Sequence, residues 1–225
     1  MTDLRVAPCS HEAAEYAVMH WHYSRRMPVG KLVKFGAWEG GQFVGSVIYG
    51  RGANKSLSSP YGLDQTEVCE LVRVALTDHQ VPVTQVVGAT LRRLREVGGT
   101  GIRLVVSFAD PAEGHHGGIY QAGNWLYLGR TASKTDYVLG DTKLNRRAYT
   151  GQQYGKPGSK AALPVGAKPV KVAGKHRYAY PLDRAMRRQL APLALPYPQP
   201  ADEGSTGAAT PSRVEGQVRS LVSAP

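Results

Sequence analysis

Residues 103–129, RLVVSFADPAEGHHGGIYQAGNWLYLG, decide the fold of this chain. They begin with an apolar run that ends at Phe108 without alternating polar residues, which is typical of a strand buried on both faces of a sheet. Asp110 follows, and a turn rich in glycine and histidine then leads into a short helical segment that contains Tyr120. Because strand ends hold reactive side chains rigidly while the adjoining loops admit substrate, we expect an active site here.

The flanking sequence predicts elements of both kinds. Helical spacing of apolar residues indicates helices at 11–22, with Ser10 as its cap, and at 82–97. Strand-like runs lie at 32–39, 42–49, 68–76, 125–128, 137–139 and 176–180. Residues 150–174 are rich in Gly, Lys and Pro, which is typical of a long loop or arm. This order predicts an α+β fold with a mixed sheet, and it is also the order of the GNAT acyltransferase sheet.

The cysteines and the hydropathy pattern indicate the compartment. Cys9 and Cys69 fall in no metal-binding or redox spacing, as expected for a reduced protein. The chain has no apolar run of 18 residues and no signal-peptide pattern. We therefore expect a soluble cytoplasmic protein without a membrane partner.

The net charge of +11 is concentrated in the C-terminal part of the chain. Residues 1–142 hold 14 Lys and Arg against 13 Asp and Glu, whereas residues 143–225 hold 14 against 4. A polyanion, most simply nucleic acid, would therefore meet the C-terminal part first. A tail that only solubilises the protein is the alternative.

Cations and aromatic residues interleave in this basic part, which is the composition of a nucleic-acid-binding face. The candidate DNA contacts are Arg146, Arg147, Lys171, Lys175, Arg177, Arg187 and Arg188. A second group, Arg92, Arg93 and Arg95, fits equally well the exposed face of its predicted helix.

His22 and Tyr23 lie where the first predicted helix ends. Imidazole and phenolate are both metal ligands, and with a carboxylate they form a nitrogen and oxygen donor set suited to iron. A helix cap or packing contact is the alternative for this pair. Asp110 fits either a catalytic carboxylate or the cap of the turn that begins at Pro111, and Tyr120 fits either a nucleophile-orienting role or core packing.

Several separated motifs occur in one order between residues 15 and 190. They are WHYS at 21–24 with Pro28 and GK at 30–31, FGAW at 35–38, FVG at 43–45, ELVR at 70–73, SFADP at 107–111 and IYQAGNW at 119–125. Together they resemble the phage Mom family of DNA-modifying proteins. The resemblance implies a GNAT-like fold that converts adenine in phage DNA to its N6-methylcarbamoyl form, which protects the genome from restriction in the infected host cell.

Carried over residue by residue, the resemblance implies that His22, Tyr23 and Asp110 gather around iron. It implies catalytic roles for Tyr23, Asp110 and Tyr120, with Ser107 as a further candidate, and an acetyl-CoA-like donor. The implied partner is double-stranded DNA with the target adenine flipped out of the stack. The oligomeric state stays open, a homodimer included.

One part of the usual GNAT pattern is missing. A glycine-rich Gln/Arg-x-x-Gly-x-Gly/Ala turn normally opens the central helix and holds pyrophosphate through its amides. Here residues 77–84 read TDHQVPVT, while Gln85 and Gly88 match only part of the spacing and fall inside the predicted helix. The sequence therefore lacks the standard pyrophosphate-binding loop for acetyl-CoA or a related acyl donor.

Three segments are expected from these observations. Residues 1–149 form a GNAT-like catalytic domain, and residues 150–190 form a basic arm and a terminal strand that complete the domain and contact DNA. Residues 191–225, rich in Pro, Ala, Ser and Gly, form a disordered tail. Two other functions stay open, namely an N-acyltransferase acting on a protein or small amine and a non-enzymatic basic DNA-binding protein.

Overall fold

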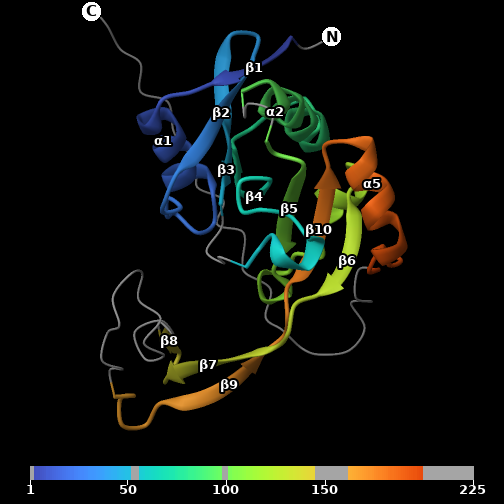
Figure 1. The fold of residues 1–225 in the computed structure, drawn as a ribbon. Coiled ribbons are helices and arrows are strands. Elements are labelled where there is room, and N and C mark those ends of the chain that lie inside the picture. The colour runs from blue at the N-terminus through green and yellow to red at the C-terminus, as the bar shows by residue number, and fades with distance from the viewer. Residues whose placement is uncertain (1–2, 52–55, 98–100, 145–161, 200–225) are drawn as a thin grey trace, which may run out of the picture.

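The structure, a computed structural model, describes residues 3–51, 56–97, 101–144 and 162–199 (Figure 1). Its main sheet has seven strands in the order β1-β2-β3-β4-β5-β10-β6. They are β1 (Leu4–Pro8), β2 (Leu32–Glu39), β3 (Gln42–Gly50), β4 (Val68–Leu76), β5 (Leu104–Ala109), β10 (His176–Pro181) and β6 (Leu126–Arg130). Only β4 and β5 pair in parallel, and the other neighbours are antiparallel. The predicted α+β fold with a mixed sheet is confirmed.

The parallel pair of strands separates at its C-terminal end. Backbone pairing between β4 and β5 runs from Val68 opposite Leu104 to Glu70 opposite Val106. Both strands continue beyond these residues, but they no longer pair with each other. The gap between them lies at the same edge of the sheet as Asp110.

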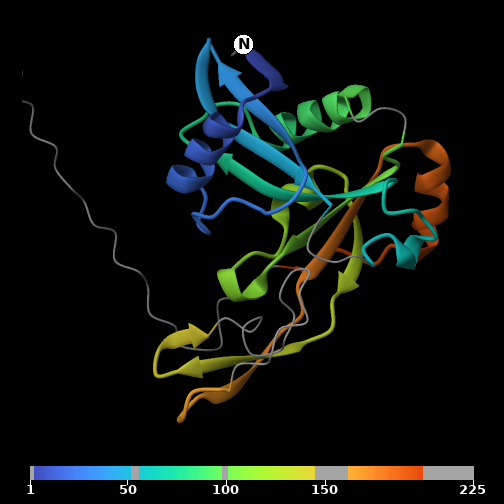
Figure 2. The ribbon, with the colours of Figure 1, turned by 60° about the vertical axis from the view of Figure 1, so that its left-hand side comes forward.

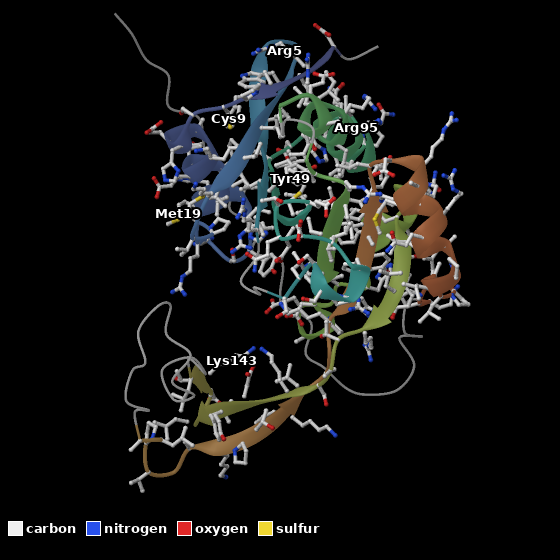
Figure 3. The ribbon with its side chains drawn as sticks, viewed as in Figure 1. Arg5, Cys9, Met19, Tyr49, Arg95 and Lys143 are labelled. Carbon is white, nitrogen blue, oxygen red and sulfur yellow. The ribbon has the colours of Figure 1, made fainter. Side chains whose placement is uncertain are left out.

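Helices cover both faces of this sheet (Figure 2). Side chains alternate between the faces along a strand, so Ile48 packs with α1 (His11–Trp21) and its neighbour Tyr49 packs with α2 (Val83–Val97). The Tyr49 hydroxyl lies 2.7 Å from Oγ1 of Thr90, which ties β3 to α2 inside the core (Figure 3). Ser10 caps α1 as expected, because its hydroxyl accepts the Ala13 amide.

The remaining helices are short. The helix α5 (Arg184–Leu190) covers the face that carries α1, because its Met186 packs with Ala179 of β10. The others are α3 (Gly118–Ala122) and the three 3₁₀ turns η1 (Ser59–Tyr61), η2 (Pro111–Glu113) and η3 (Ala191–Leu193). None of the helices in the described ranges is long and apolar enough to cross a membrane.

A second sheet of three strands projects from the main body, at the bottom of Figure 1. Its central strand β7 (Lys134–Leu139) pairs with β8 (Thr142–Leu144) and β9 (Lys168–Val172). The strand β9 falls within 150–174, which the sequence predicted to be a loop. It is mostly exposed and is held by its pairing with β7, so no alternation of buried residues marks it in the sequence.

The short elements β1, β8 and α5 also escaped prediction. The edge strand β1 has only five residues, one of them buried, and α5 is a seven-residue segment whose charges hide its apolar stripe. Asp183 starts α5 by accepting the Met186 amide at 2.7 Å.

Residues 191–199, which the sequence placed in the tail, pack against the domain. Leu195 bridges to Tyr127 of β6, and the Tyr197 hydroxyl donates to the Trp125 carbonyl at 2.8 Å. These contacts make residues 191–199 part of the folded body, while residues 200–225 lie outside the described ranges.

Candidate active site

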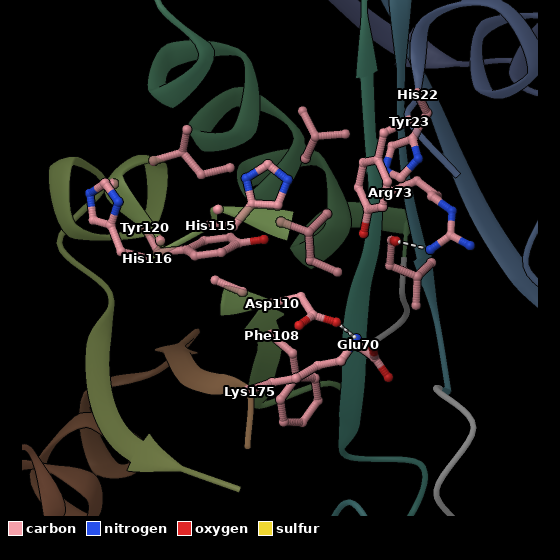
Figure 4. A pocket seen from close by; sticks show the side chains of 18 of the residues that line it. His22, Tyr23, Glu70, Arg73, Phe108, Asp110, His115, His116, Tyr120 and Lys175 are labelled. Atoms are coloured by element: carbon pink, nitrogen blue, oxygen red, sulfur yellow. Dashed lines mark hydrogen bonds and ion pairs between the residues drawn. The ribbon is translucent and has the colours of Figure 1, made fainter. Parts of the chain in front are cut away.

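A cavity of about 690 Å³ opens where β4 and β5 separate (Figure 4). Its walls come from the end of α1, from β4 and β5, from the loop before α3 and from the residue that precedes β10. The polar and aromatic side chains that line it are Trp21, His22, Tyr23, Glu70, Arg73, Phe108, Asp110, His115, His116, Tyr120 and Lys175. A cavity of this size accommodates a small molecule or a single nucleobase. It therefore brings together His22, Tyr23, Asp110 and Tyr120, which the sequence singled out.

Glu70 is a functional candidate that the sequence analysis missed. It lies on β4 in the cavity wall, where burial raises its pKa to about 7 against the opposing charges of Lys175 and Arg73. A carboxyl group with such a pKa exchanges its proton readily near neutral pH, as a general base must. The signal in the sequence is a glutamate within the otherwise apolar start of the predicted strand 68–76.

Tyr120 reaches into the cavity from α3 and is almost fully buried. Its hydroxyl lies 2.8 Å from Oγ of Ser107, which also lies 2.9 Å from the Leu71 carbonyl oxygen. Burial raises the pKa of Tyr120 to about 12, although the Ser107 hydrogen bond opposes that shift, so the phenol stays neutral. Ser107 has a single hydroxyl hydrogen, which donates either to the Leu71 carbonyl, so that the phenol donates to Ser107, or to the phenol oxygen, which leaves the phenol hydrogen to donate into the cavity. Ser107 is thus a buried partner of Tyr120.

The loop before α3 is shaped by Tyr178 of β10. The Tyr178 hydroxyl donates to the His116 carbonyl at 2.6 Å, and Gln121 donates to the same hydroxyl oxygen at 3.1 Å. Gly117 lies flat against this ring with a φ of +93°, and a Cβ at that position would overlap the ring. Glycine is therefore required there, and the close approach holds Tyr120 in place.

Asp110 and Lys175 form an ion pair across the cavity, with Oδ2 2.9 Å from Nζ (Figure 4). The other carboxylate oxygen accepts the Ala112 amide at 3.1 Å and so caps η2. Burial raises the pKa of Asp110, but Lys175, the Ala112 amide and Lys134 together outweigh burial and hold that pKa below its usual value. Asp110 is therefore ionised, and both of its oxygens are engaged.

Lys175, one of the predicted DNA contacts, lines the cavity. Its backbone is fixed by Thr131, whose hydroxyl accepts the Lys175 amide at 2.9 Å and whose own amide donates to the Lys175 carbonyl at 2.9 Å. A Cβ at Gly174 would overlap the Thr131 carbonyl, so this approach also requires glycine. These backbone contacts of Lys175 position its ammonium group beside Asp110 and near Glu70 (Figure 4).

The loop after α1 carries His22 and Tyr23 over the cavity. The Arg73 guanidinium on β4 donates to the Arg26 carbonyl at 3.2 Å, which ties this loop to the sheet. The Tyr23 ring is 61% exposed and lies 5.5 Å from the His115 ring, measured between centroids. Both rings therefore lie at the mouth of the cavity.

A comparison with protein families matches residues 3–199 to the Mom protein family. The chain belongs to the Mom protein family. No curated protein matches it. Solved structures similar to it include FeeM, an N-acyl amino acid synthase from uncultured soil microbes, with 14% identity over 85% of this chain and 97% of that chain and a TM-score of 0.47. A Bacillus subtilis acetyltransferase in complex with CoA matches with 10% identity over 80% of this chain and 99% of that chain, at a TM-score of 0.44.

The resemblance to the Mom family implied iron, but the geometry of His22, Tyr23 and Asp110 does not fit an iron site. The Ser24 amide donates to Nδ1 of His22 at 3.1 Å, so in the neutral ring the other nitrogen carries the proton. Burial, with Arg73 and His115, lowers the pKa of His22 to about 4, which keeps that ring neutral. The Asp110 carboxylate, the third implied ligand, is already paired with the Lys175 ammonium. Within the described ranges, no three His, Cys, Asp or Glu side chains are grouped to hold a metal ion.

In this Mom protein, a side-chain carboxylate accepts the backbone amides just before α2, where the sequence lacks a pyrophosphate loop. The amides of Gln80 and Val81, just before α2, donate to the two carboxylate oxygens of Glu39, each at 2.9 Å. In a pyrophosphate loop, amides in this position would bind phosphate. Here a buried carboxylate of the protein itself accepts them, and the Gln80 hydrogen bond, which outweighs the effect of burial, lowers the pKa of Glu39. These two amides are therefore not available to the phosphates of an acyl-CoA donor.

The other predicted DNA contacts of this Mom protein lie apart from the cavity. Arg177 donates to the Leu128 carbonyl at 3.0 Å, and Lys171 lies exposed on β9. Arg187 and Arg188 are exposed on α5. The predicted contacts Arg146 and Arg147 lie outside the described residues.

Proposed function

We propose that this protein modifies DNA by transferring an acyl-derived group, methylcarbamoyl or a related one, to the N6 amine of adenine. Membership of the Mom family supports DNA as the substrate. The observation that carries the proposal is a carboxyl group with a pKa of about 7, Glu70, in one cavity with a neutral buried phenol, Tyr120. The first group accepts a proton near neutral pH, and the second donates a hydrogen bond to developing negative charge.

The reaction needs such a base because the exocyclic amine of adenine is conjugated with the ring and is a poor nucleophile. The amine nitrogen bonds to the carbonyl carbon of the donor, which is a thioester when an acyl group is transferred and a thiocarbamate when methylcarbamoyl is transferred. In doing so the amine must lose a proton, and Glu70 receives it. The carbon–sulfur bond then breaks and the thiolate leaves. Tyr120 donates a hydrogen bond to the oxyanion that forms between these steps, and Ser107 holds the phenol oxygen in place.

The target adenine must leave the duplex, because inside the stack its amine is paired and covered by its neighbours. The aromatic rings of Tyr23 and His115 at the mouth of the cavity are placed to stack on an extruded base. Trp125 is not available for this role, because it is only 1% exposed and packs against Tyr120 and Tyr180 in the core. Stacking on the base therefore falls to the residues at the mouth.

The test is mass spectrometry of nucleosides from plasmid DNA recovered after expression of the protein. We expect a mass shift on deoxyadenosine with the wild type and none with Glu70→Gln. The matched control is Glu12→Gln, which changes an exposed glutamate on α1 and should leave the shift intact. Unmodified DNA together with an acylated protein or small amine would contradict the proposal in favour of a different acceptor. Unmodified DNA bound by the protein, with no acylated product, would favour a purely DNA-binding role.

A further inference from the structure

A second cavity, also of about 690 Å³, lies between α2 and α5. Four arginines line it, namely Arg92 and Arg95 from α2 and Arg184 and Arg187 from α5. Each pair has a spacing of three residues, so both members project from one side of their helix. The sequence separates the two pairs by about 90 residues, and the structure brings them to one place.

The positive charge of this arginine cavity is not compensated by the described residues. Its one carboxylate, Asp183, is engaged by Arg103 at 2.9 Å and by the Met186 amide at 2.7 Å. Across the described ranges, none of the four lining arginines forms an ion pair. Their neighbour Arg93, outside the cavity, pairs with Glu96 at 2.9 Å. Four like charges in one cavity repel each other, and a bound anion would relieve that repulsion.

We propose that this arginine cavity binds phosphate groups of the DNA backbone. The inference rests on the proposed function, which makes DNA the substrate. Guanidinium groups donate in a planar fork that matches phosphate oxygens, so they bind phosphodiesters well. A free nucleotide would also need a surface for its base, but Tyr180, the aromatic residue of this cavity, packs its ring against Trp125 at 5.4 Å.

The two cavities lie at opposite ends of one strand. Lys175, which lines the candidate active site, precedes β10, and Tyr180 and Pro181 at the end of β10 line the arginine cavity. A strand of six residues spans roughly 20 Å at about 3.3 Å per residue. Because DNA rises about 3.4 Å per base pair, roughly six base pairs cover this distance. The cavity is thus a second contact for the DNA that delivers its adenine to the first.

The experiment measures the salt dependence of binding to a fluorescently labelled duplex by anisotropy. Removing one phosphate contact lowers the slope of log K against log salt concentration by about 0.9, so Arg92→Ala combined with Arg187→Ala should lower it by about 2. The matched control combines Arg5→Ala with Arg93→Ala, which removes the same charge outside the cavity and should leave the slope unchanged. An equal decrease in both double variants would overturn the inference, because general charge would then be the cause. Thermal unfolding monitored by circular dichroism checks that each variant is folded.

A second arm of the experiment distinguishes DNA from a free anion. Inorganic phosphate is titrated into the wild type and the cavity variant at constant ionic strength. Phosphate binding that requires Arg92 and Arg187, with an unchanged slope for DNA, would overturn DNA as the ligand. DNA binding is measured independently of the transfer reaction, so unmodified nucleosides would refute only the proposed function. An unchanged slope with modified nucleosides would refute only the arginine cavity as a DNA contact.

Discussion

Two cavities of this protein have the same volume, about 690 Å³, but differ in charge: the candidate active site holds carboxylates and cations together, whereas arginines dominate the other. In the candidate active site, Asp110 is paired with Lys175, and burial raises the pKa of Glu70 to about 7. In the arginine cavity, the lining guanidinium groups are exposed and form no ion pair with described residues. Burial and pairing adjust proton affinity, which serves chemistry, whereas exposed and uncompensated charge serves binding. Substitutions in the two cavities should therefore change different kinetic parameters.

The largest effect is expected at the phenol of the candidate active site. Tyr120→Phe removes a hydrogen bond donor for the oxyanion and should lower kcat by about 10²-fold, as loss of one oxyanion donor does. The measurement is the rate of deoxyadenosine modification at saturating DNA. Tyr16→Phe, on the exposed side of α1, is the matched control and should keep the wild-type rate. A wild-type kcat in Tyr120→Phe would remove Tyr120 from the reaction.

A smaller effect of a different kind is expected in the arginine cavity. Arg187→Ala weakens binding of substrate and transition state alike, so KM for DNA should rise severalfold while kcat stays unchanged. The measurement is the modification rate as a function of duplex concentration at physiological salt. A lower kcat with unchanged KM would mean that this cavity acts on the chemistry and that the contrast between the two cavities is wrong.

A pH profile tests the electrostatic coupling inside the candidate active site. Glu70 must be ionised to accept a proton, so kcat should rise with pH around a midpoint of about 7. Asp110→Asn removes one negative charge and leaves Lys175 facing Glu70 alone, which favours ionised Glu70. The midpoint should therefore move to lower pH by less than about one unit. An unchanged midpoint would show that Asp110 has no electrostatic effect on Glu70, because a purely structural role for Asp110 would leave the midpoint where it is.

The smallest effect is on stability. Because the pKa of Glu70 is raised by folding, the folded state binds more protons than the unfolded state between pH 4.5 and about 7. Stability is therefore lost as the pH rises through this window, and ionised Glu70 destabilises the fold above it. Glu70→Gln should raise the Tm at pH 8 by a few degrees and have little effect near pH 4. A Tm that falls at pH 8 would show that the ionised carboxylate stabilises the fold.

Local patterns predicted much of the scaffold. The helix at 11–22 with its Ser10 cap, the hairpin over 32–39 and 42–49, and the strand at 68–76 all occur within a residue or two of their expected bounds. Each of these signals depends on residues that are close in the sequence, such as a cap or an apolar periodicity. The exposed strand β9 and the charged helix α5 carry no such periodicity, and only their packing partners stabilise them.

The candidate site was predictable only in part. Asp110 at a strand end, Tyr120 in the following helix and the pair His22–Tyr23 stand out because of their local context, and the structure places all of them around one cavity. Glu70 did not stand out, because its raised pKa comes from burial, which a sequence does not display.

By itself, the sequence determined the strand that ends before Asp110, the helices and hairpin around it, and the family, because these depend on local order along the chain. Only the tertiary structure decided that Lys175 pairs with Asp110 and that the arginines of α2 and α5 share a cavity. The physical reason is distance along the chain. Charges 65 or more residues apart interact strongly only when the fold brings them within a few ångströms, because water and salt screen them at longer range.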